Sequence, residues 1–256
     1  MNEMKRLLSF TRRAVDDYGM IDEGDRIAVG VSGGKDSLTL LATLAEMRRF
    51  YPKKYEVVAV TVDMGFDGQD FSPVRKFCDL IGVEYRIVPT DIAKIIFEVR
   101  KEPNPCSLCA KMRRGSLHAE AQAAGCNKVA LGHHYDDAVE TFMMNLFFEG
   151  RLGCFSPVTY LSNRKLTLIR PLLYAQEKDI LYFTRKRALP VIKSPCPEDH
   201  ATERENMKIL LRNLEKDNDG LRHRIFHAMC KGEIDGFKTA GRYPDAGKID
   251  EKDLCE

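Results

Sequence analysis

The stretch SGGKDS, at residues 32–37, packs two hydroxyls, two glycines, a lysine and an aspartate into one short loop. It follows an apolar run and precedes a helical pattern, so free backbone N–H groups at the start of the helix can receive an anion. Gly33 and Gly34 let the main chain come close to a ligand and adopt positive φ. Ser32 and Ser37 add hydroxyl donors, and Lys35 adds a point charge. The loop therefore predicts a phosphate-binding site.

Asp36 needs a separate explanation, because a carboxylate repels a bare phosphate. Either a Mg²⁺ ion lies between the carboxylate and the phosphates, or the side chain caps the first helical turn. The common NTPase loop does not fit, because Val29 stands where its first glycine belongs and Asp36 stands where a serine or threonine should follow Lys35. The dinucleotide pattern G-x-G-x-x-G is missing as well.

A second polar group lies in LGHHYDDAVETFMMNL, at residues 131–146, where a predicted strand ends and a helix begins. Asp136, Asp137 and Glu140 enrich the first helical turn in acid, which the helix dipole alone would favour. The carboxyl ends of parallel strands meet at one edge of a sheet, so this turn should lie near the glycine loop. Taken alone, the acidic turn is best explained by the helix dipole, and only the family resemblance given below implies that His133 and Asp137 position ATP and Mg²⁺.

Three of the eight cysteines form a candidate metal site. Cys106 and Cys109 form a C-x-x-C pair, and Cys196 lies between two prolines. The residues alone leave three alternatives open: reactive thiols, a zinc site completed by His118 or His200, and an iron–sulfur site.

Strands alternate with helices over most of the chain, which predicts an α/β fold with a doubly wound, mostly parallel, five-stranded sheet. We expect an N-terminal helix at 1–21, a nucleotide-binding domain with the cysteine site at 22–200, and a helical C-terminal segment with a loose tail at 201–256. No apolar run approaches the roughly 18 residues of a membrane span, and no signal sequence is evident, so we expect a cytoplasmic protein. The predicted strands are 26–31, 55–65, 84–90, 127–133 and 165–172, and the predicted helices are 3–20, 36–50, 71–81, 91–100, 136–148 and 176–188.

The loop SGGKDS resembles the PP-loop of the ATP pyrophosphatase superfamily, and GHHYDDAVET resembles that superfamily's G-H-x-x-D-D-x-x-E/Q-T signature. These enzymes share an adenine nucleotide alpha hydrolase-like fold, transfer AMP to a substrate oxygen and release pyrophosphate. The resemblance implies that residues 32–37 hold the pyrophosphate and that main chain near Val29 and Asp63 contacts the adenosine. Lys35 and Asp137 are then the catalytic candidates at the nucleotide.

With the C-x-x-C pair, RPLLYAQEKDI and the late cysteine, the chain from about residue 20 to 215 resembles the tRNA 2-thiocytidine synthetase group. The resemblance implies that Cys106, Cys109 and Cys196 hold a [4Fe–4S] cluster with one open iron. It implies a reaction that adenylates the C2 oxygen of a cytidine in tRNA and replaces it with sulfur. It also implies a sulfur donor such as a cysteine desulfurase, and a homodimer. The alternatives are a tRNA lysidine synthetase, a small-molecule PP-loop thiolase and an ATP-binding, metal-dependent sensor.

RNA binding requires clustered cations, and several short clusters are present. For any one of them, a solvated helix face is the competing interpretation. We favour the run just after the C-x-x-C pair, because it could guide a phosphate backbone towards the sulfur site. The candidates are Lys111, Arg113 and Arg114 in that run, and Arg164, Lys165 and Arg170 around the fifth predicted strand.

Overall fold

The computed structural model describes residues 3–100, 105–197 and 203–238. The chain divides into two compact units, Met1–His134 with Val158–Ala201, and Tyr135–Pro157 with Thr202–Glu256. This grouping differs from the expected three-part division, because the N-terminal helix packs within the first unit and the helix after His134 packs with the C-terminal helices. None of the described helices combines the length and apolar character needed to cross a bilayer.

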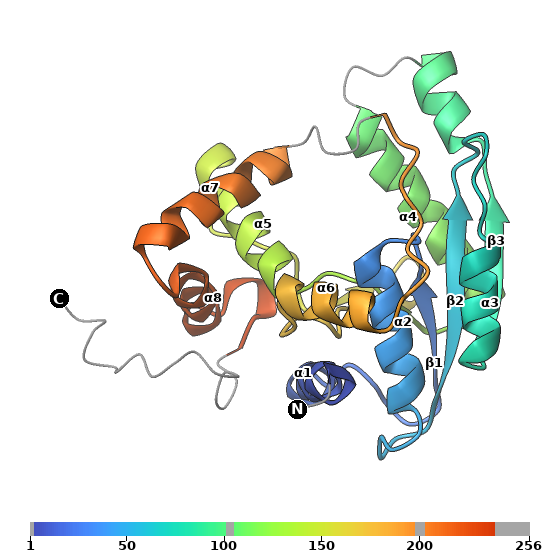
Figure 1. The fold of residues 1–256 in the computed structure, drawn as a ribbon, viewed down its shortest axis with the longest axis horizontal. Coiled ribbons are helices and arrows are strands. Elements are labelled where there is room, and N and C mark those ends of the chain that lie inside the picture. The colour runs from blue at the N-terminus through green and yellow to red at the C-terminus, as the bar shows by residue number, and fades with distance from the viewer. Residues whose placement is uncertain (1–2, 101–104, 198–202, 239–256) are drawn as a thin grey trace. The chain divides into compact units, whose positions relative to one another are not determined.

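The first unit is built on a six-stranded sheet with the order β3-β2-β1-β4-β6-β5 (Figure 1). Neighbouring strands are parallel except for β5, which runs antiparallel to β6. The mostly parallel α/β fold predicted from the sequence is thus confirmed. The strands are β1 (Asp25–Gly30), β2 (Tyr55–Asp63), β3 (Glu84–Pro89), β4 (Lys128–Ala130), β5 (Val158–Leu161) and β6 (Leu166–Ile169).

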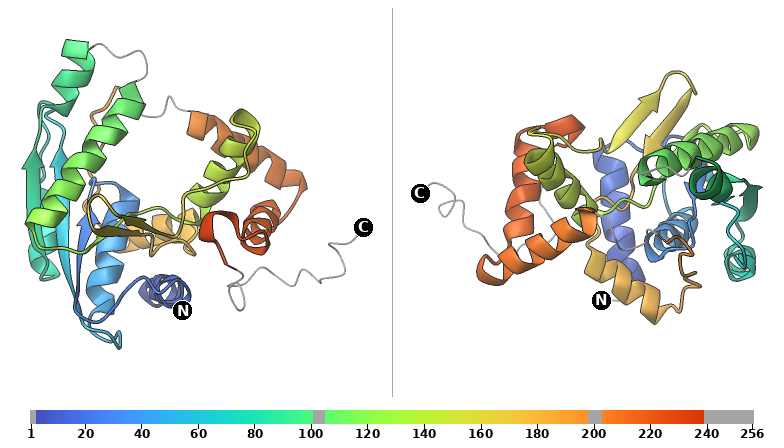
Figure 2. Two further views of the ribbon diagram at one scale, coloured as in Figure 1. Left: turned by 180° about the vertical axis from the view of Figure 1, so that it is seen from behind. Right: turned by 90° about the horizontal axis from the view of Figure 1, so that it is seen from above.

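The expected number of five strands was wrong, because β5 was not recognised. This strand has only four residues and pairs along one side alone, from Val158 opposite Ile169 to Leu161 opposite Leu166. So short an edge strand carries too few residues for a clear alternating pattern. It forms a hairpin with β6 at the end of the sheet, drawn in yellow in Figure 2.

The strand order reverses between β1 and β4. From β1 the chain adds β2 and then β3 on one side, and β4 begins the other side. In open α/β sheets, ligands bind in the crevice outside the carboxyl ends of the strands at this reversal point. The segments that leave β1 and β4 there are the SGGKDS loop and the GHH segment.

Helices cover both faces of the sheet, and α2 and α4 lie on opposite faces (Figures 1 and 2). On one side α1, α2 and α6 pack together, and α3 packs against β3. On the other side α4 packs across β1 to β4, where Leu117, Ala121 and Ala124 join the apolar core. The helix bounds are α1 (Glu3–Asp17), α2 (Lys35–Met47), α3 (Ser72–Leu80), α4 (Pro105–Ala123) and α6 (Glu177–Lys186).

Two helical segments differ from expectation. The predicted helix at 91–100 is mainly a π-helix, η1 (Lys94–Arg100). The C-x-x-C pair, which lies outside every predicted helix, is on the first turns of α4. Pro105 begins this helix, a position where its fixed φ and missing N–H carry no penalty.

The second unit contains α5 (Tyr135–Phe148), α7 (Glu203–Asp217), α8 (Leu221–Lys231) and a 3-10 turn, η2 (Ile234–Gly236). Tyr135 stacks on Phe226 with ring centroids 4.4 Å apart. The helices expected after Pro197 are confirmed by α7 and α8. The predicted tail lies outside the described residues from position 239 onward.

Candidate functional site

The SGGKDS loop turns sharply from β1 into α2. Gly33 has φ +83°, and Gly34 is the N-cap residue of α2 in an extended conformation. A glycine at this position has no side-chain oxygen to compete for the first amides of the helix, and no side-chain cap is formed. The start of α2 therefore keeps the anion-binding geometry that the sequence predicts.

The two serine hydroxyls of the loop lie together at its mouth. The Oγ atoms of Ser32 and Ser37 are 3.3 Å apart, and Ser37 Oγ donates to the Gly34 carbonyl at 2.9 Å. The Gly34 amide donates to Ser32 Oγ at 3.3 Å. The loop is thus ordered by its own side chains before any ligand binds.

Lys35 lies between two carboxylates, with its Nζ 2.9 Å from Asp36 Oδ2 and 3.2 Å from Glu177 Oε1. Burial works against the charge, but Asp36 and Glu177 outweigh it, so the pKa of Lys35 is raised. Its ammonium group is therefore charged at neutral pH. Glu177, at the start of α6, gave no sequence signal because 142 positions separate it from Lys35.

The other oxygen of Asp36 is buried without a hydrogen-bond partner among the described residues. The ring of His134 faces this oxygen, with its Nε2 3.6 Å away. Leaving a buried carboxylate oxygen unsatisfied is costly. The capping alternative is not supported, because α2 has no side-chain cap.

The GHH segment lies directly against the start of α2. A Cβ atom added to Gly132 would be 3.2 Å from Asp36 C and Ser37 N, so only glycine permits this approach without displacement. Next to it, Arg170 Nε donates to His133 Nδ1 at 3.2 Å. Arg170 is only 7% exposed. Its expected role in RNA binding is therefore corrected, since it is a buried partner of the motif histidine.

The acidic turn of α5 belongs to the second unit, where arginines neutralise it. Arg222 Nη1 lies 3.0 Å from Asp136 and 3.7 Å from Glu140. Arg204 Nη1 lies 3.9 Å from Asp137 Oδ1. Neither pairing had a signal in the sequence, because the two arginines come from α7 and α8, more than sixty positions along the chain.

The two expected adenosine contacts lie differently. Val29 is fully buried within β1 and pairs with Ala59 and Ala130 on the neighbouring strands. Strands on both sides therefore flank its main chain, which leaves little room for an adenosine. Asp63 is the last residue of β2, where Thr90 Oγ1 donates to its carbonyl at 2.7 Å. Of the two residues, Asp63 is therefore the better placed to contact an adenosine.

The cysteine pair lies close to that same end of β2. Cys106 and Cys109 are three residues apart on α4, a spacing that places them on one helix face. Cys109 Sγ lies 3.8 Å from Met64 Sδ, and Met64 directly follows Asp63. Met64 had no sequence signal, because a lone methionine after a strand is usually a core residue.

Cys196 reaches the same region from the other end of the unit. Four residues before it, the Ile192 amide donates to the Gly33 carbonyl at 2.9 Å, so its segment is attached to the SGGKDS loop. Burial raises the pKa of Cys109, Arg113 lowers it, and the charges of Cys196 and Cys106 raise it further. Cys106 and Cys196 thus both lie close enough to Cys109 to influence its pKa.

No group of three potential ligands among the residues with described positions is close enough to form a preassembled metal site. Cys106, Cys109 and Cys196 therefore lie in the same part of the first unit, but their sulfur atoms are not close enough to bind one metal ion together. The zinc set with His118 is ruled out, because this residue lies nine positions beyond Cys109, roughly 13 Å along α4, and is buried. His200 lies outside the described residues.

Thiol alkylation should separate these cysteines from the core cysteines. In native, metal-free protein, iodoacetamide should modify the exposed Cys106 first and leave Cys78 unmodified. Burial raises the pKa of Cys78 to about 12, which reduces its thiolate by about a thousandfold relative to an unperturbed thiol. Peptide mapping by mass spectrometry measures the order, and early modification of Cys78 would contradict this placement.

Two adjacent glycines of the loop provide a matched pair of substitutions. Gly33→Ala should lower the free energy of unfolding by about 2 kcal/mol, because a Cβ at positive φ is strained and would lie 3.1 Å from Ile192 Cβ. Gly34→Ala should lower it by only about 0.5–1 kcal/mol, because alanine is a poorer N-cap residue than glycine but its Cβ would meet only Ser32 Oγ, at 3.4 Å. Thermal melting without nucleotide measures both, and equal losses would contradict the described loop.

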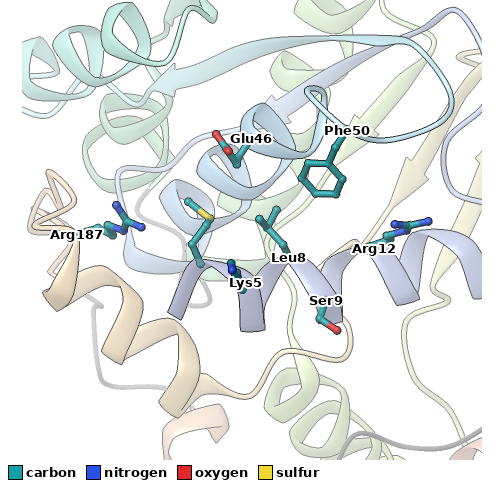
Figure 3. A pocket seen from close by; sticks show the side chains of 8 residues that line it. Lys5, Leu8, Ser9, Arg12, Glu46, Phe50 and Arg187 are labelled. Carbon is teal, nitrogen blue, oxygen red and sulfur yellow. The ribbon is translucent and has the colours of Figure 1, made fainter. Parts of the chain in front are cut away.

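A cavity of about 580 Å³ lies elsewhere in the first unit, between α1, the end of α2 and the end of α6 (Figure 3). Leu8 and Phe50 line it together with several charged side chains. Arg187 is paired with Glu3, and Arg12 with Asp16. No glycine is among the described residues that line this cavity, so it has no counterpart of the phosphate-binding loop, and we assign the functional site to the carboxyl edge of the sheet.

Comparisons with known proteins agree with this geometry. The model of the PP-loop domain family matches residues 5–234. The tRNA-cytidine(32) 2-sulfurtransferase of Geobacter sulfurreducens is 43% identical over 228 residues, covering 88% of this chain and 89% of that protein. The same enzyme of Pelobacter propionicus is 42% identical, with coverage of 89% and 88%. Among solved structures, the U34-tRNA thiolase NcsA from Methanococcus maripaludis with its [4Fe-4S] cluster has a TM-score of 0.71 at 28% identity, covering 85% of this chain and 75% of that one.

Proposed function

Since the chain belongs to the PP-loop domain family and, within it, to the tRNA-cytidine(32) 2-sulfurtransferases, we infer that it is an ATP-dependent enzyme that replaces the C2 oxygen of a tRNA cytidine with sulfur. Activation of an oxygen by ATP and delivery of sulfur must occur at one place. The function therefore requires a nucleotide loop and a sulfur site at the same edge of the sheet.

The observation that carries this proposal is the attachment of both thiol segments to the nucleotide edge. Cys109 touches Met64, the residue after Asp63 at the end of β2. The segment that leads to Cys196 is hydrogen-bonded through Ile192 to Gly33 of the phosphate loop. The thiols and the phosphate loop therefore share the carboxyl edge around β1 and β2.

The first step needs only ATP and the RNA. The C2 oxygen attacks the α-phosphate, a P–O bond forms, and the bond to the departing pyrophosphate breaks. The amides of the SGGKDS loop, Lys35 and the two serine hydroxyls stabilise the negative charge that develops on the phosphates. In the second step, hydrosulfide attacks C2 and AMP leaves with the former base oxygen.

A [4Fe–4S] cluster fits the donor set of Cys106, Cys109 and Cys196, because three soft thiolates are the ligands that iron–sulfur clusters prefer. When bound by three cysteines, such a cluster supplies an open coordination position for a sulfur nucleophile. The chain itself contributes the spacing of the pair on α4, the contact with Met64, and the partial burial of Cys109 that limits access of water.

A Mg²⁺ ion fits Asp36, because this carboxylate has one buried oxygen without a hydrogen-bond partner among the described residues, at the mouth of the phosphate loop. Mg²⁺ prefers carboxylate and phosphate oxygens together with water. Binding would satisfy that oxygen and offset repulsion between Asp36 and the triphosphate.

The remaining partners stay predictions. Lys111, Arg113 and Arg114 on α4 are exposed and follow the cysteine pair, as RNA binding near the sulfur site requires. Sulfur delivered by a cysteine desulfurase, or as free sulfide, balances the second step. The homodimer follows from the family resemblance.

Reconstitution under anaerobic conditions tests the proposal. Purified protein with iron and sulfide restored is incubated with ATP, Mg²⁺, sulfide and unmodified tRNA, and the digested nucleosides are analysed by mass spectrometry. We expect 2-thiocytidine and equal amounts of AMP and pyrophosphate. Lysidine, or thiolation of a free small molecule with no change in the tRNA, would reject the proposed function.

A further inference from the structure

Four cations of the first unit lie along one side of α4 and on the turn between β5 and β6. We call them the basic strip, and its members are Lys111, Arg114, Arg164 and Lys165. All four are exposed, and among the described residues none has a carboxylate within ion-pair distance.

Arginines on the neighbouring strands, in contrast, do have acidic partners. Arg26 pairs with Glu56 and Glu84 on neighbouring strands. Arg86 binds Glu120 at 3.0 Å, so the acidic residue of α4 nearest in sequence to the strip is already occupied. The positive charge of the strip is therefore uncompensated within the described chain.

The turn is docked onto α4 by a specific contact. Gln122 Nε2 donates to the Arg164 carbonyl at 2.9 Å. Arg114, His118 and Gln122 follow one another at intervals of four residues, so they lie along one helix face. The turn that carries Arg164 and Lys165 thus continues the line of cations that begins at Lys111, with the hairpin beside α4 in Figure 2.

His118 lies in the middle of this line, between Arg114 and Gln122 on the same helix face. Its side chain is buried, and its Nε2 has no hydrogen-bond partner among the described residues. Burial lowers the pKa of His118, and Arg164 and Arg114 lower it further. An imidazole that feels both guanidinium groups and no carboxylate indicates an unbalanced positive region, the kind of surface that receives phosphates.

We propose that the basic strip is an RNA-backbone site that docks the tRNA along α4, separate from the residues that act on the cytidine. From Cys109 to Gln122 the helix extends roughly 20 Å, long enough to follow several consecutive phosphates of one strand. The strip thus fixes the direction in which the RNA leaves the sulfur site. This inference rests on the proposed function, because it takes the substrate RNA as the occupant.

The test removes two charges from the turn without disturbing its backbone. The variant is Arg164→Gln with Lys165→Asn, because Lys165 has φ +49° and asparagine tolerates this conformation. The matched control is Arg49→Gln with Lys76→Asn, two exposed cations in other parts of the first unit. Fluorescence anisotropy with full-length tRNA at several salt concentrations measures the affinity and its salt dependence.

We expect the strip variant to bind tRNA about tenfold more weakly at low salt, with the log–log salt slope reduced by roughly 1.5, while the control matches wild type. In turnover, KM for tRNA should rise with kcat retained. Unchanged affinity and salt slope, or an equal loss of affinity in the control, would contradict the proposal that the basic strip binds RNA. Neither result would contradict the proposed sulfurtransferase function. Wild-type protein that binds no tRNA would instead reject the proposed function together with the strip. If the turn variant does not fold, Arg114→Gln on the helix surface decides the same question, with an expected slope change of about half that size.

Discussion

Replacing Cys109 by serine should lower the formation of 2-thiocytidine on the order of a thousandfold, with ATP binding unchanged. Serine keeps the size of the side chain but replaces a soft thiolate with a hydroxyl, which is a poor ligand for iron and a poor acceptor of sulfur. Cys109 is the thiol that joins the site together, because it contacts Met64 and both Cys106 and Cys196 influence its pKa. The measurement is a product assay beside a separate assay of ATP binding.

The matched control is Cys154→Ser. This thiol is also half-buried, but it belongs to the second unit, where its Sγ lies 3.5 Å from the Ala138 carbonyl. It should keep near-wild-type activity. Cys109→Ser, and Cys196→Ser made in the same way, should also lose the visible absorbance of a reconstituted cluster. Full thiolation by Cys109→Ser would remove the cysteine site from the mechanism.

Replacing Lys35 by methionine should slow tRNA-dependent pyrophosphate release by about a hundredfold to a thousandfold. Methionine preserves much of the apolar stem and removes only the charge that stabilises the departing pyrophosphate. The thiol site should be unaffected, so the alkylation order of the cysteines and the cluster absorbance should match wild type. Lys54→Met, at an exposed lysine outside the loop, is the control.

The pH dependence adds a second readout for Lys35. Burial opposes its charge, but Asp36 and Glu177 raise its pKa above the ordinary lysine value of 10.5. The protonated form therefore persists as pH rises, and the rate should not fall between about pH 7 and 9 through loss of this proton. Glu177→Gln removes one of the two carboxylates that raise this pKa, so the pKa of Lys35 should be lower in this variant than in wild type. A decline in that range for wild type, absent in Lys35→Met, would contradict the assignment.

The sequence is most informative where the chemistry is local. The SGGKDS loop indicates an anion site because all of its donors lie within six consecutive residues. The strand–helix alternation predicts the parallel sheet, because hydrophobic periodicity is a property of short windows. The edge strand β5 was missed because four residues contain too little of that pattern.

Contacts between distant segments had no such signal. Arg170 is one of several similar cations in the sequence, and only its burial beside His133 distinguishes it from the exposed Arg164. Met64 and Ile192 looked like ordinary apolar residues. Their importance comes from where the end of β2 and the segment before Cys196 are placed.

By itself the sequence determined the identity of the chemical groups: a phosphate loop, three candidate thiols and an α/β scaffold to carry them. Only the tertiary structure decided which of these groups meet, because the order of parallel strands brings the ends of β1, β2 and β4 to one edge. It also decided which charges stay uncompensated, since ion pairs form between elements far apart in the chain. The basic strip is visible only once Glu120 is seen to be occupied by Arg86 and Gln122 is seen to hold the turn of Arg164.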